Sequence, residues 1–182
     1  MSFVLASASP RRAELLRAAG FTFTVDPVDV DESILPDEAP EAHVRRLARQ
    51  KAAAGALRHP GLPVLGADTV VVLDGRILGK PRGDAEAHGM LAALSGRVHQ
   101  VFTGVAVARD GRIRDAVDVS AVTFGRLTDA EIADYVATGE PADKAGAYAI
   151  QGRASRYVER LEGSYSGVVG LPVAVAHRLL IS

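Results

Sequence analysis

The sequence predicts an α/β domain whose sheet combines parallel and antiparallel strands. Apolar runs typical of strands alternate along the chain with segments that have the features of helices, which is the pattern of a sheet flanked by helices. Two Asp-Gly pairs, at residues 74–75 and 110–111, lie between apolar runs and predict tight hairpins, so some strands must pair antiparallel. The chain has 182 residues and neither a repeat nor a linker, so we expect one domain over residues 1–182.

The first half of the chain predicts three strands and three helices. The strands are predicted where apolar residues cluster, at residues 3–6, 64–73 and 77–78. The helices are predicted to run from residue 10 to the glycine at 20, and over residues 40–57 and 84–94. Ser9 followed by Pro10 is typical of a helix start, because serine can cap free N–H groups and proline suits the first turn.

The second half continues the alternation. Two long strands flank the second Asp-Gly turn, at residues 100–107 and 113–124. Thr128 and Glu131 have the spacing of a capping box, which predicts a helix that begins there and ends at Gly139. The chain then predicts a glycine-rich stretch of short strands and loops, followed by a final helix, at residues 146–170 and 172–181.

Composition excludes several classes of function. The formal net charge is -1, which argues against a polybasic protein that coats nucleic acid or a membrane surface. Cysteine is absent, so a disulfide scaffold, a thiolate zinc site and a cysteine nucleophile are excluded. The five histidines are scattered singly, which argues against a zinc hydrolase. No apolar run reaches the ~18 residues of a membrane span and no secretory signal is evident, so we expect a cytoplasmic protein.

Two arginines occupy an unusual place at the start of the first helix. A helix N-terminus carries a partial positive charge, so acidic residues are expected there, yet Arg11 and Arg12 follow Pro10. Cations at this end make sense if an anion such as phosphate binds there, with Ser7 and Ser9 as hydroxyl donors. The alternative is a solvated arginine pair, which would cost only a few tenths of a kcal/mol.

A carboxylate interrupts the most apolar strand. Asp68 lies within the run 64–73, where an isolated charge would be very costly to bury. It must therefore be paired, bind a metal or face a cleft, and a metal ligand or a general base is the favoured interpretation. Gly66 and Ala67, just before it, would let a ligand or another chain approach closely. The alternative is that Asp68 caps a turn at the end of the strand.

Four further polar residues stand out. Lys51 lies at a helical spacing on the apolar face of its helix, either extending to solvent or reaching a phosphate. Lys80 follows the first hairpin in a loop set by Gly79 and Pro81, a weak signal alone. Glu32 lies in an acidic loop and is either solvated or, with Asp68, a ligand of Mg²⁺.

The fourth is Gln151, which we expect to be buried among small residues. Its amide can both donate and accept, as reading the edge of a base requires, although a loop glutamine that satisfies the backbone is an equal alternative. The sequence has neither a phosphate-binding P-loop nor a serine nucleophile elbow, so the residues indicate phosphate chemistry through positioning, a metal and an activated water.

At this point the motifs resemble those of a known family. Residues 5–16, Leu-Ala-Ser-Ala-Ser-Pro-Arg-Arg-Ala-Glu-Leu-Leu, resemble the opening of the Maf family of nucleoside triphosphate pyrophosphatases. Similar motifs follow in order over essentially the whole chain, at residues 30–32, 47–52, 66–71, 79–81, 94–96, 143–152 and 163–172. One departure is Gly167, where the family usually has Asn; any contact of that Asn must come from elsewhere, such as the backbone.

The resemblance implies a Maf/inosine-triphosphatase-like fold, with a long mixed sheet that frames a cleft. It implies hydrolysis of a nucleoside triphosphate to the monophosphate and pyrophosphate with a divalent metal, Mg²⁺ or Mn²⁺. Asp68 matches the family's proposed proton acceptor, and Arg12, Thr69 and Gln151 match the branch that acts on dTTP and UTP. The resemblance also suggests a homodimer, a house-cleaning role against non-standard nucleotides and a link to cell-division arrest.

These expectations combine into one mechanism. Glu32 and Asp68 would hold the metal, and Arg11 or Arg12, Lys51 and Lys80 would neutralise the leaving pyrophosphate. Asp68 would act either as the base or as a metal ligand. Thr69 should point to the opposite face of its strand from Asp68, so it would reach a ligand only if the strand ends or bends there.

Two other functions fit the same residues. A nucleotidyltransferase breaks the same bond but needs an acceptor pocket, for which no motif is seen. A regulatory module would bind the nucleotide without turnover and act through a partner.

Overall fold

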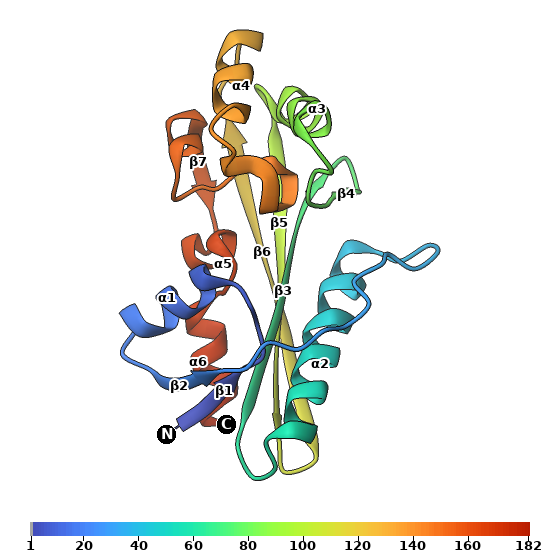
Figure 1. Cartoon of the computed structure of the whole chain (residues 1–182), viewed down its shortest axis with the longest axis vertical. Coiled ribbons are helices and arrows are strands. Elements are labelled where there is room, and N and C mark those ends of the chain that lie inside the picture. The colour runs from blue at the N-terminus through green and yellow to red at the C-terminus, as the bar shows by residue number, and fades with distance from the viewer. Residues whose placement is uncertain (1) are drawn as a thin grey trace.

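A mixed seven-stranded sheet forms the centre of the molecule. The computed structural model describes residues 2–182 (Figure 1). Its strands, in the spatial order β2-β1-β3-β5-β6-β7 with β4 beside β3, are β1 (Ser2–Leu5), β2 (Thr22–Val25), β3 (Val64–Leu73), β4 (Arg76–Leu78), β5 (Val98–Arg109), β6 (Arg112–Phe124) and β7 (Val158–Glu162). Strand β1 is parallel to β2 and β3, and the other pairs are antiparallel. The mixed sheet predicted from the two hairpins is therefore confirmed.

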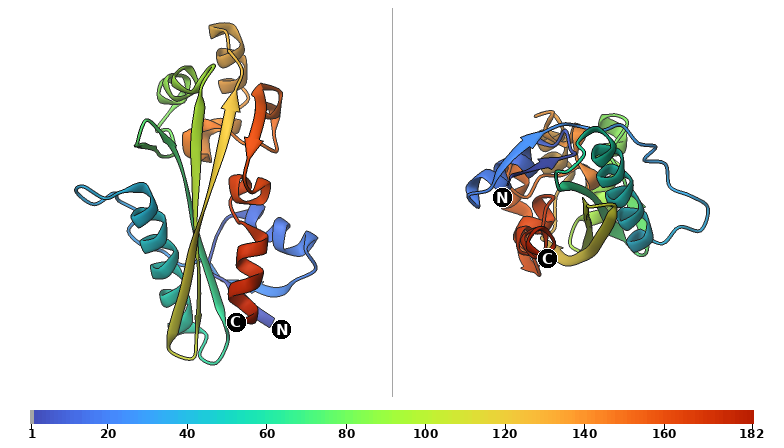
Figure 2. Two further views of the ribbon diagram at one scale, coloured as in Figure 1. Left: turned by 180° about the vertical axis from the view of Figure 1, so that it is seen from behind. Right: turned by 90° about the horizontal axis from the view of Figure 1, so that it is seen from below.

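Helices cover both faces of this sheet. The α-helices are α1 (Pro10–Ala18), α2 (Pro40–Arg58), α3 (Asp84–Leu94), α4 (Asp129–Val136), α5 (Tyr165–Val169) and α6 (Val173–Ile181). Three 3₁₀ turns lie at Glu140–Asp143, Ala145–Ala147 and Arg153–Tyr157. Helix α2 lies on one face of the long strands, while α1, α5 and α6 lie on the other (Figure 2). None of the helices within residues 2–182 has the length and apolar character needed to cross a membrane.

The long strands β3 and β5 run through the two largest apolar cores, and β6 contributes to one of them. One core lies among β1, α1 and α6 and includes Leu16, Leu65 and Leu171. The other lies toward α3 and α4 and includes Leu91 and Phe124. Strands β3 and β5 contribute to both, which makes them the structural link between the two ends of the elongated molecule (Figure 1).

Helix α2 rests on the sheet through two glycines. A Cβ atom at Gly104 would lie 2.2 Å from the Val44 carbonyl oxygen, and one at Gly66 would lie 2.4 Å from the Ala48 carbonyl oxygen. Since no side chain fits in that space, the helix backbone lies directly against β3 and β5. Gly66 therefore serves the approach of α2, and the expectation that it makes room for a ligand or another chain is wrong.

The predicted elements agree closely with the structure. The bounds of β3 and α3 are those predicted, and the capping box of Thr128 and Glu131 is present. Both residues of the Asp74-Gly75 turn have positive φ, as a tight hairpin requires. Strand β2 was not predicted, and the glycine-rich stretch contains α5 and 3₁₀ turns besides its short strand. Ser9 precedes α1 as expected, but its side chain makes no capping hydrogen bond.

Candidate active site

A cleft of about 610 Å³ lies between α2, the start of α1 and the middle of β3. Its lining includes every residue singled out from the sequence as a site residue: Ser7, Ser9, Arg11, Arg12, Glu32, Lys51, Asp68, Thr69, Lys80 and Gln151. These residues come from six separate segments, so the chain fold brings together what the sequence holds far apart.

The cleft opens at a gap in the sheet. Strand β1 pairs with β3 only at Val64 and Leu65, and β4 pairs with β3 only from Val71 onward. Between these points, residues 66–70 have β5 on one side and no strand among residues 2–182 on the other. Side chains on both faces of β3 can therefore reach the same space.

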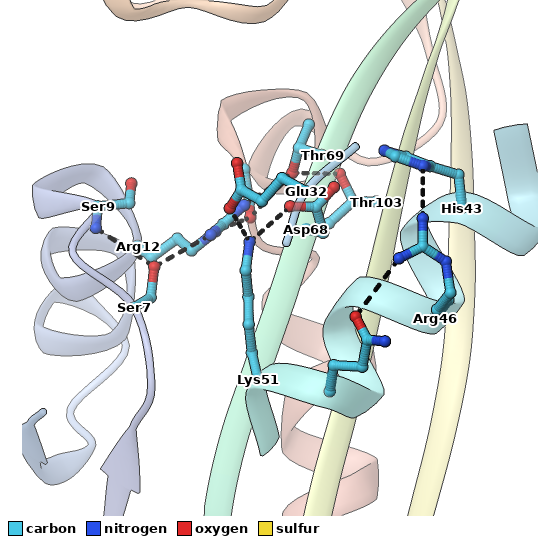
Figure 3. Close-up of polar contacts among 12 residues, drawn as sticks. Ser7, Ser9, Arg12, Glu32, His43, Arg46, Lys51, Asp68, Thr69 and Thr103 are labelled. Atoms are coloured by element: carbon cyan, nitrogen blue, oxygen red, sulfur yellow. Dashed lines mark hydrogen bonds and ion pairs between the residues drawn. The ribbon is translucent and has the colours of Figure 1, made fainter. Parts of the chain in front are cut away.

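Lys51 lies at the centre of the site (Figure 3). Its Nζ atom is 2.7 Å from Asp68 Oδ1 and 2.6 Å from Glu32 Oε1, and the residue is only 6% exposed. Two carboxylates thus compensate one buried ammonium group, as burial of a charge requires. The prediction that Lys51 lies on the apolar face of its helix is confirmed, and its alternative, extension into solvent, is wrong.

Asp68 lies in the middle of β3, where its backbone pairs with Gly104. It is 8% exposed, and its ion pair with Lys51 explains how a carboxylate is tolerated in this strand. The alternative that it caps the end of the strand is wrong. Of the two carboxylate oxygens of Asp68, Oδ1 accepts a hydrogen bond from Lys51, whereas Oδ2 has no hydrogen-bond partner among residues 2–182. Oδ2 is therefore available to a ligand or water.

The charges around Glu32 favour its ionised form. Burial alone would raise the pKa of this carboxyl, but the hydrogen bond from Lys51 and the charges of Lys51, Lys80 and Arg12 together lower it. Glu32 comes from the loop after β2, and its side chain is half exposed. The acidic loop thus brings a carboxylate to Lys51, and the interpretation of Glu32 as merely solvated is wrong.

Arg12 is held by three hydrogen bonds. Its Nε donates to the Gly170 carbonyl (2.8 Å), Nη1 donates to Ser7 Oγ (3.0 Å) and Nη2 donates to Thr69 Oγ1 (3.2 Å). Burial lowers the pKa of Arg12, with the charges of Asp68 and Glu32 opposing that effect. For this arginine, the alternative of a solvated side chain is wrong.

The neighbouring polar groups at the start of α1 are less constrained. Ser7 Oγ also accepts a hydrogen bond from the Ser9 backbone N–H, at 3.2 Å. The Arg11 side chain is 27% exposed, and its Nη1 lies 4.0 Å from an Asp143 carboxylate oxygen. Arg11 therefore faces the cleft from a more open position than Arg12.

Thr69 points to the opposite face of β3 from Asp68. The strand is regular here, with Thr69 paired to Thr103, so the end or bend of the strand that was expected to bring Thr69 to a ligand is absent. Thr69 lines the cleft because the sheet is open along this edge of β3. Its hydroxyl contacts Arg12 and Thr103 (Figure 3). It also lies 3.3 Å from the Gly170 carbonyl oxygen.

Two residues at the rim remain free of protein partners. Gln151 is exposed in a turn closed by the hydrogen bond from the Gly152 N–H to the Ala149 carbonyl, so its expected burial is wrong. Within the described chain, neither the Gln151 amide nor the Lys80 ammonium has a hydrogen-bond or ion-pair partner. Both line the cleft and can turn toward a ligand.

Other cleft residues were missed by sequence reasoning. They are His43, Lys144 and Tyr148. His43, Leu47 and Lys51 repeat every four residues along α2, and this spacing could have indicated His43. The Nδ1 atom of His43 lies 2.9 Å from Glu38 Oε2.

The donor set suits a cation shared with a phosphate ligand. Residues 2–182 contain no cluster of three or more His, Asp and Glu side chains that could hold a metal alone. Glu32 and Asp68 nevertheless each place one oxygen within 2.7 Å of the same Lys51 atom, so their carboxylates converge. Two carboxylates completed by phosphate oxygens are a typical ligand set for Mg²⁺. The two residues therefore fit the expected metal.

Comparison with known proteins places the chain in a family. The model of the Maf family, described as Maf-like protein, matches residues 2–182. The chain belongs to the Maf family. Among solved structures, it aligns with the Staphylococcus aureus Ham1 protein over 71% of this chain and 73% of that one, with 18% identity and a TM-score of 0.47.

Several relatives in the Maf family are about half identical to this chain. One from Geotalea uraniireducens is 55% identical and covers 94% of this chain and 90% of its own length. One from Methylobacillus flagellatus is 52% identical, with 97% and 89% covered. One from Escherichia coli O157:H7 is 51% identical, with 98% and 91% covered. All three are named dTTP/UTP pyrophosphatase.

Proposed function

We propose that this Maf family member hydrolyses dTTP and UTP to the monophosphate and pyrophosphate. The observation that carries the proposal is the charge in the cleft, which is lined by five cationic side chains and by the three carboxylates of Glu32, Asp68 and Asp143. An excess of cations over carboxylates suits a polyphosphate, and the names of the relatives indicate which triphosphates to test.

Asp68 is the proposed general base. The free Oδ2 oxygen would accept a proton from the water that attacks the α-phosphorus, while Lys51 holds Oδ1 in place. As the bond between the α- and β-phosphates breaks, negative charge grows on the leaving pyrophosphate. Arg12, Lys51 and Lys80 would neutralise that charge, which is where fixed cations lower the barrier most.

Glu32 is the proposed ligand of a divalent cation, Mg²⁺ or Mn²⁺, and Asp68 is its second ligand in the alternative in which Asp68 binds the metal instead of acting as the base. When bound, such a cation supplies charge neutralisation and orientation of the phosphates. Glu32 is ionised over the neutral pH range, because the surrounding cations lower its pKa, and it is therefore available as a ligand.

Gln151 is proposed to select the base. Its amide has no protein partner among residues 2–182 and could pair with a carbonyl oxygen and the ring N–H of uracil or thymine. A base with another edge would leave the amide unpaired, which disfavours it. The proposal takes residues 1–182 as one domain that acts in the cytoplasm.

The test is the release of pyrophosphate from dTTP by the purified protein with Mg²⁺. We expect equal amounts of dTMP and pyrophosphate, and nearly complete loss of both in Asp68→Asn. A matched control is Asp110→Asn, in the turn between β5 and β6, which should retain activity. Binding of dTTP without any pyrophosphate would instead identify a regulatory module. Appearance of the nucleotidyl group on an added acceptor would identify a transferase.

A further inference from the structure

A threonine outside the cleft is connected to Arg12 through hydrogen bonds. Thr103 lies on β5 beside Thr69, is 1% exposed and does not line the cleft. Its Oγ1 atom is 3.0 Å from Thr69 Oγ1 and 2.9 Å from the Gly167 carbonyl oxygen. A buried hydroxyl with two partners is a fixed part of the structure.

The hydrogens in this group can be assigned a direction. A carbonyl only accepts, and Thr103 Oγ1 lies closer to the Gly167 carbonyl oxygen (2.9 Å) than Thr69 Oγ1 lies to the Gly170 carbonyl oxygen (3.3 Å), so we assign the single hydroxyl proton of Thr103 to Gly167. Thr103 can then only accept from Thr69, and Thr69 in turn accepts from Arg12 Nη2. The result is a directed chain from Arg12 through two hydroxyls to a carbonyl. In it, each hydroxyl donates once and accepts once.

Thr103 also reaches Arg12 through a second route. Gly167 lies in α5, and Gly170 directly follows this helix and accepts from Arg12 Nε. By binding Gly167, Thr103 fixes the segment that presents the Gly170 carbonyl. A Cβ atom at position 167 would lie 2.5 Å from Asp118 Oδ2, so glycine leaves room there for the Asp118 side chain.

Arg12 keeps donors for a ligand in this arrangement. A guanidinium group has five N–H groups, and three of them are engaged by Gly170, Ser7 and Thr69. One N–H on each Nη atom is left, and the side chain lines the cleft. The direction of these two groups is set by the three bonds that hold the guanidinium plane.

We propose that Thr103 is a positioning residue that aims Arg12 at the phosphates of the substrate. This inference rests on the proposed function for its kinetic test. Loss of the Thr103 hydroxyl would leave Thr69 free to rotate toward the Gly170 carbonyl, which lies 3.3 Å away, and would release α5 at Gly167. Both changes loosen Arg12 without removing any group that touches substrate.

The experiment is a double-mutant cycle between Thr103→Val and Arg12→Lys, with dTTP as substrate. Valine has the shape of threonine without its hydroxyl. We expect Thr103→Val alone to lower kcat/KM by about tenfold or more, because small misplacements of catalytic groups are costly. In the Arg12→Lys background the same change should alter kcat/KM by less than twofold, because the guanidinium group that Thr103 positions is already absent.

Two control variants separate positioning from general damage. Thr103→Ser keeps the hydroxyl and should restore kcat/KM to near the parent value. Thr123→Val makes the matched change on β6 and should leave kcat/KM unchanged. An equal loss from Thr103→Val in both backgrounds, or no loss in the parent, would overturn the proposal.

A second measurement does not depend on turnover. The Arg12 Nε–H donates to Gly170, so its hydrogen exchange, followed by ¹⁵N NMR, reports how firmly the side chain is held. We expect faster exchange in Thr103→Val than in the parent or Thr103→Ser. Unchanged exchange would refute the inference even if the protein hydrolyses dTTP. Conversely, an inactive parent with accelerated exchange in Thr103→Val would refute the proposed function alone.

Discussion

Gly66→Ala tests whether the packing of α2 on the sheet sets the position of Lys51. The added Cβ would lie 2.4 Å from the Ala48 carbonyl oxygen, 2.6 Å from the Ala52 nitrogen and 3.1 Å from Lys51 Cβ. The first two neighbours belong to the helix backbone and cannot rotate away. The helix must therefore move off β3 at the turn that carries Lys51.

The size of the effect follows from these distances. Real Cβ atoms essentially never come closer than 3.0 Å to such atoms, so α2 has to shift by more than half an ångström. Overpacking of this kind typically costs about 1–3 kcal/mol of unfolding free energy. A shift of about 1 Å in a catalytic group lowers rates by roughly 10²-fold, so we expect kcat/KM for dTTP to fall by about 10- to 100-fold.

The assay combines urea unfolding with steady-state kinetics of pyrophosphate release. The matched control is Gly89→Ala in α3, where nothing lies within 4 Å of the new methyl group. This control should gain about 0.5–1 kcal/mol from helix propensity and keep full activity. A Gly66→Ala protein with the parent's stability and kcat/KM would refute the reasoning.

Three further predictions concern the site and its support. Asp68→Asn should keep the fold, judged by circular dichroism, but lower kcat by about 10²–10⁴-fold, as loss of a general base does; near-normal turnover would exclude that role. Gln151→Ala should narrow the preference for dTTP and UTP over CTP, ATP and GTP in kcat/KM measured at equal Mg²⁺, whereas an unchanged ratio would place base selection elsewhere. Burial lowers the pKa of His99 from 6.5 to about 4, so protonation favours the unfolded chain. The contribution of neutral His99 to the free energy of unfolding is thus complete above pH 6.5 and falls by about 3 kcal/mol between pH 6.5 and 4. Unfolding curves of the parent and His99→Phe should differ in this pH window, and parallel pH profiles would contradict the prediction.

The sequence predicted best what depends on local chemistry. Caps, Asp-Gly turns and apolar runs act within a few residues, and the bounds of β3 and α3 follow from them. Lys51 was identified because helical periodicity alone places it on the buried face of α2. Asp68 was identified because a carboxylate in an apolar strand needs a partner wherever that partner lies.

What could not be predicted depends on contacts between distant segments. Glu32 joins Lys51 only because the loop after β2 folds back across α2, and nothing in its acidic neighbours indicates this. For Gly66 the predicted neighbour was wrong, because a glycine in a strand indicates that some group approaches closely but not which element that group belongs to. Thr103 gave no signal because threonine is ordinary in strands, and its proposed role arises from one hydroxyl on β3 and a carbonyl in α5.

The lengths of two strands decide where the site lies. Adjacent residues of a regular strand point to opposite faces, so Asp68 and Thr69 would normally be separated by the sheet. Here β1 stops pairing at Leu65 and β4 starts pairing at Val71, which leaves the intervening edge of β3 open. Lys51 and its two carboxylate partners lie on one face, and the guanidinium group of Arg12 lies on the other. Both groups can then contact one ligand placed at that edge. The proposed base Asp68 and the contact of the proposed phosphate-binding residue Arg12 to Thr69 thus lie on a single strand, and the two apolar cores at either end of β3 hold that strand in place.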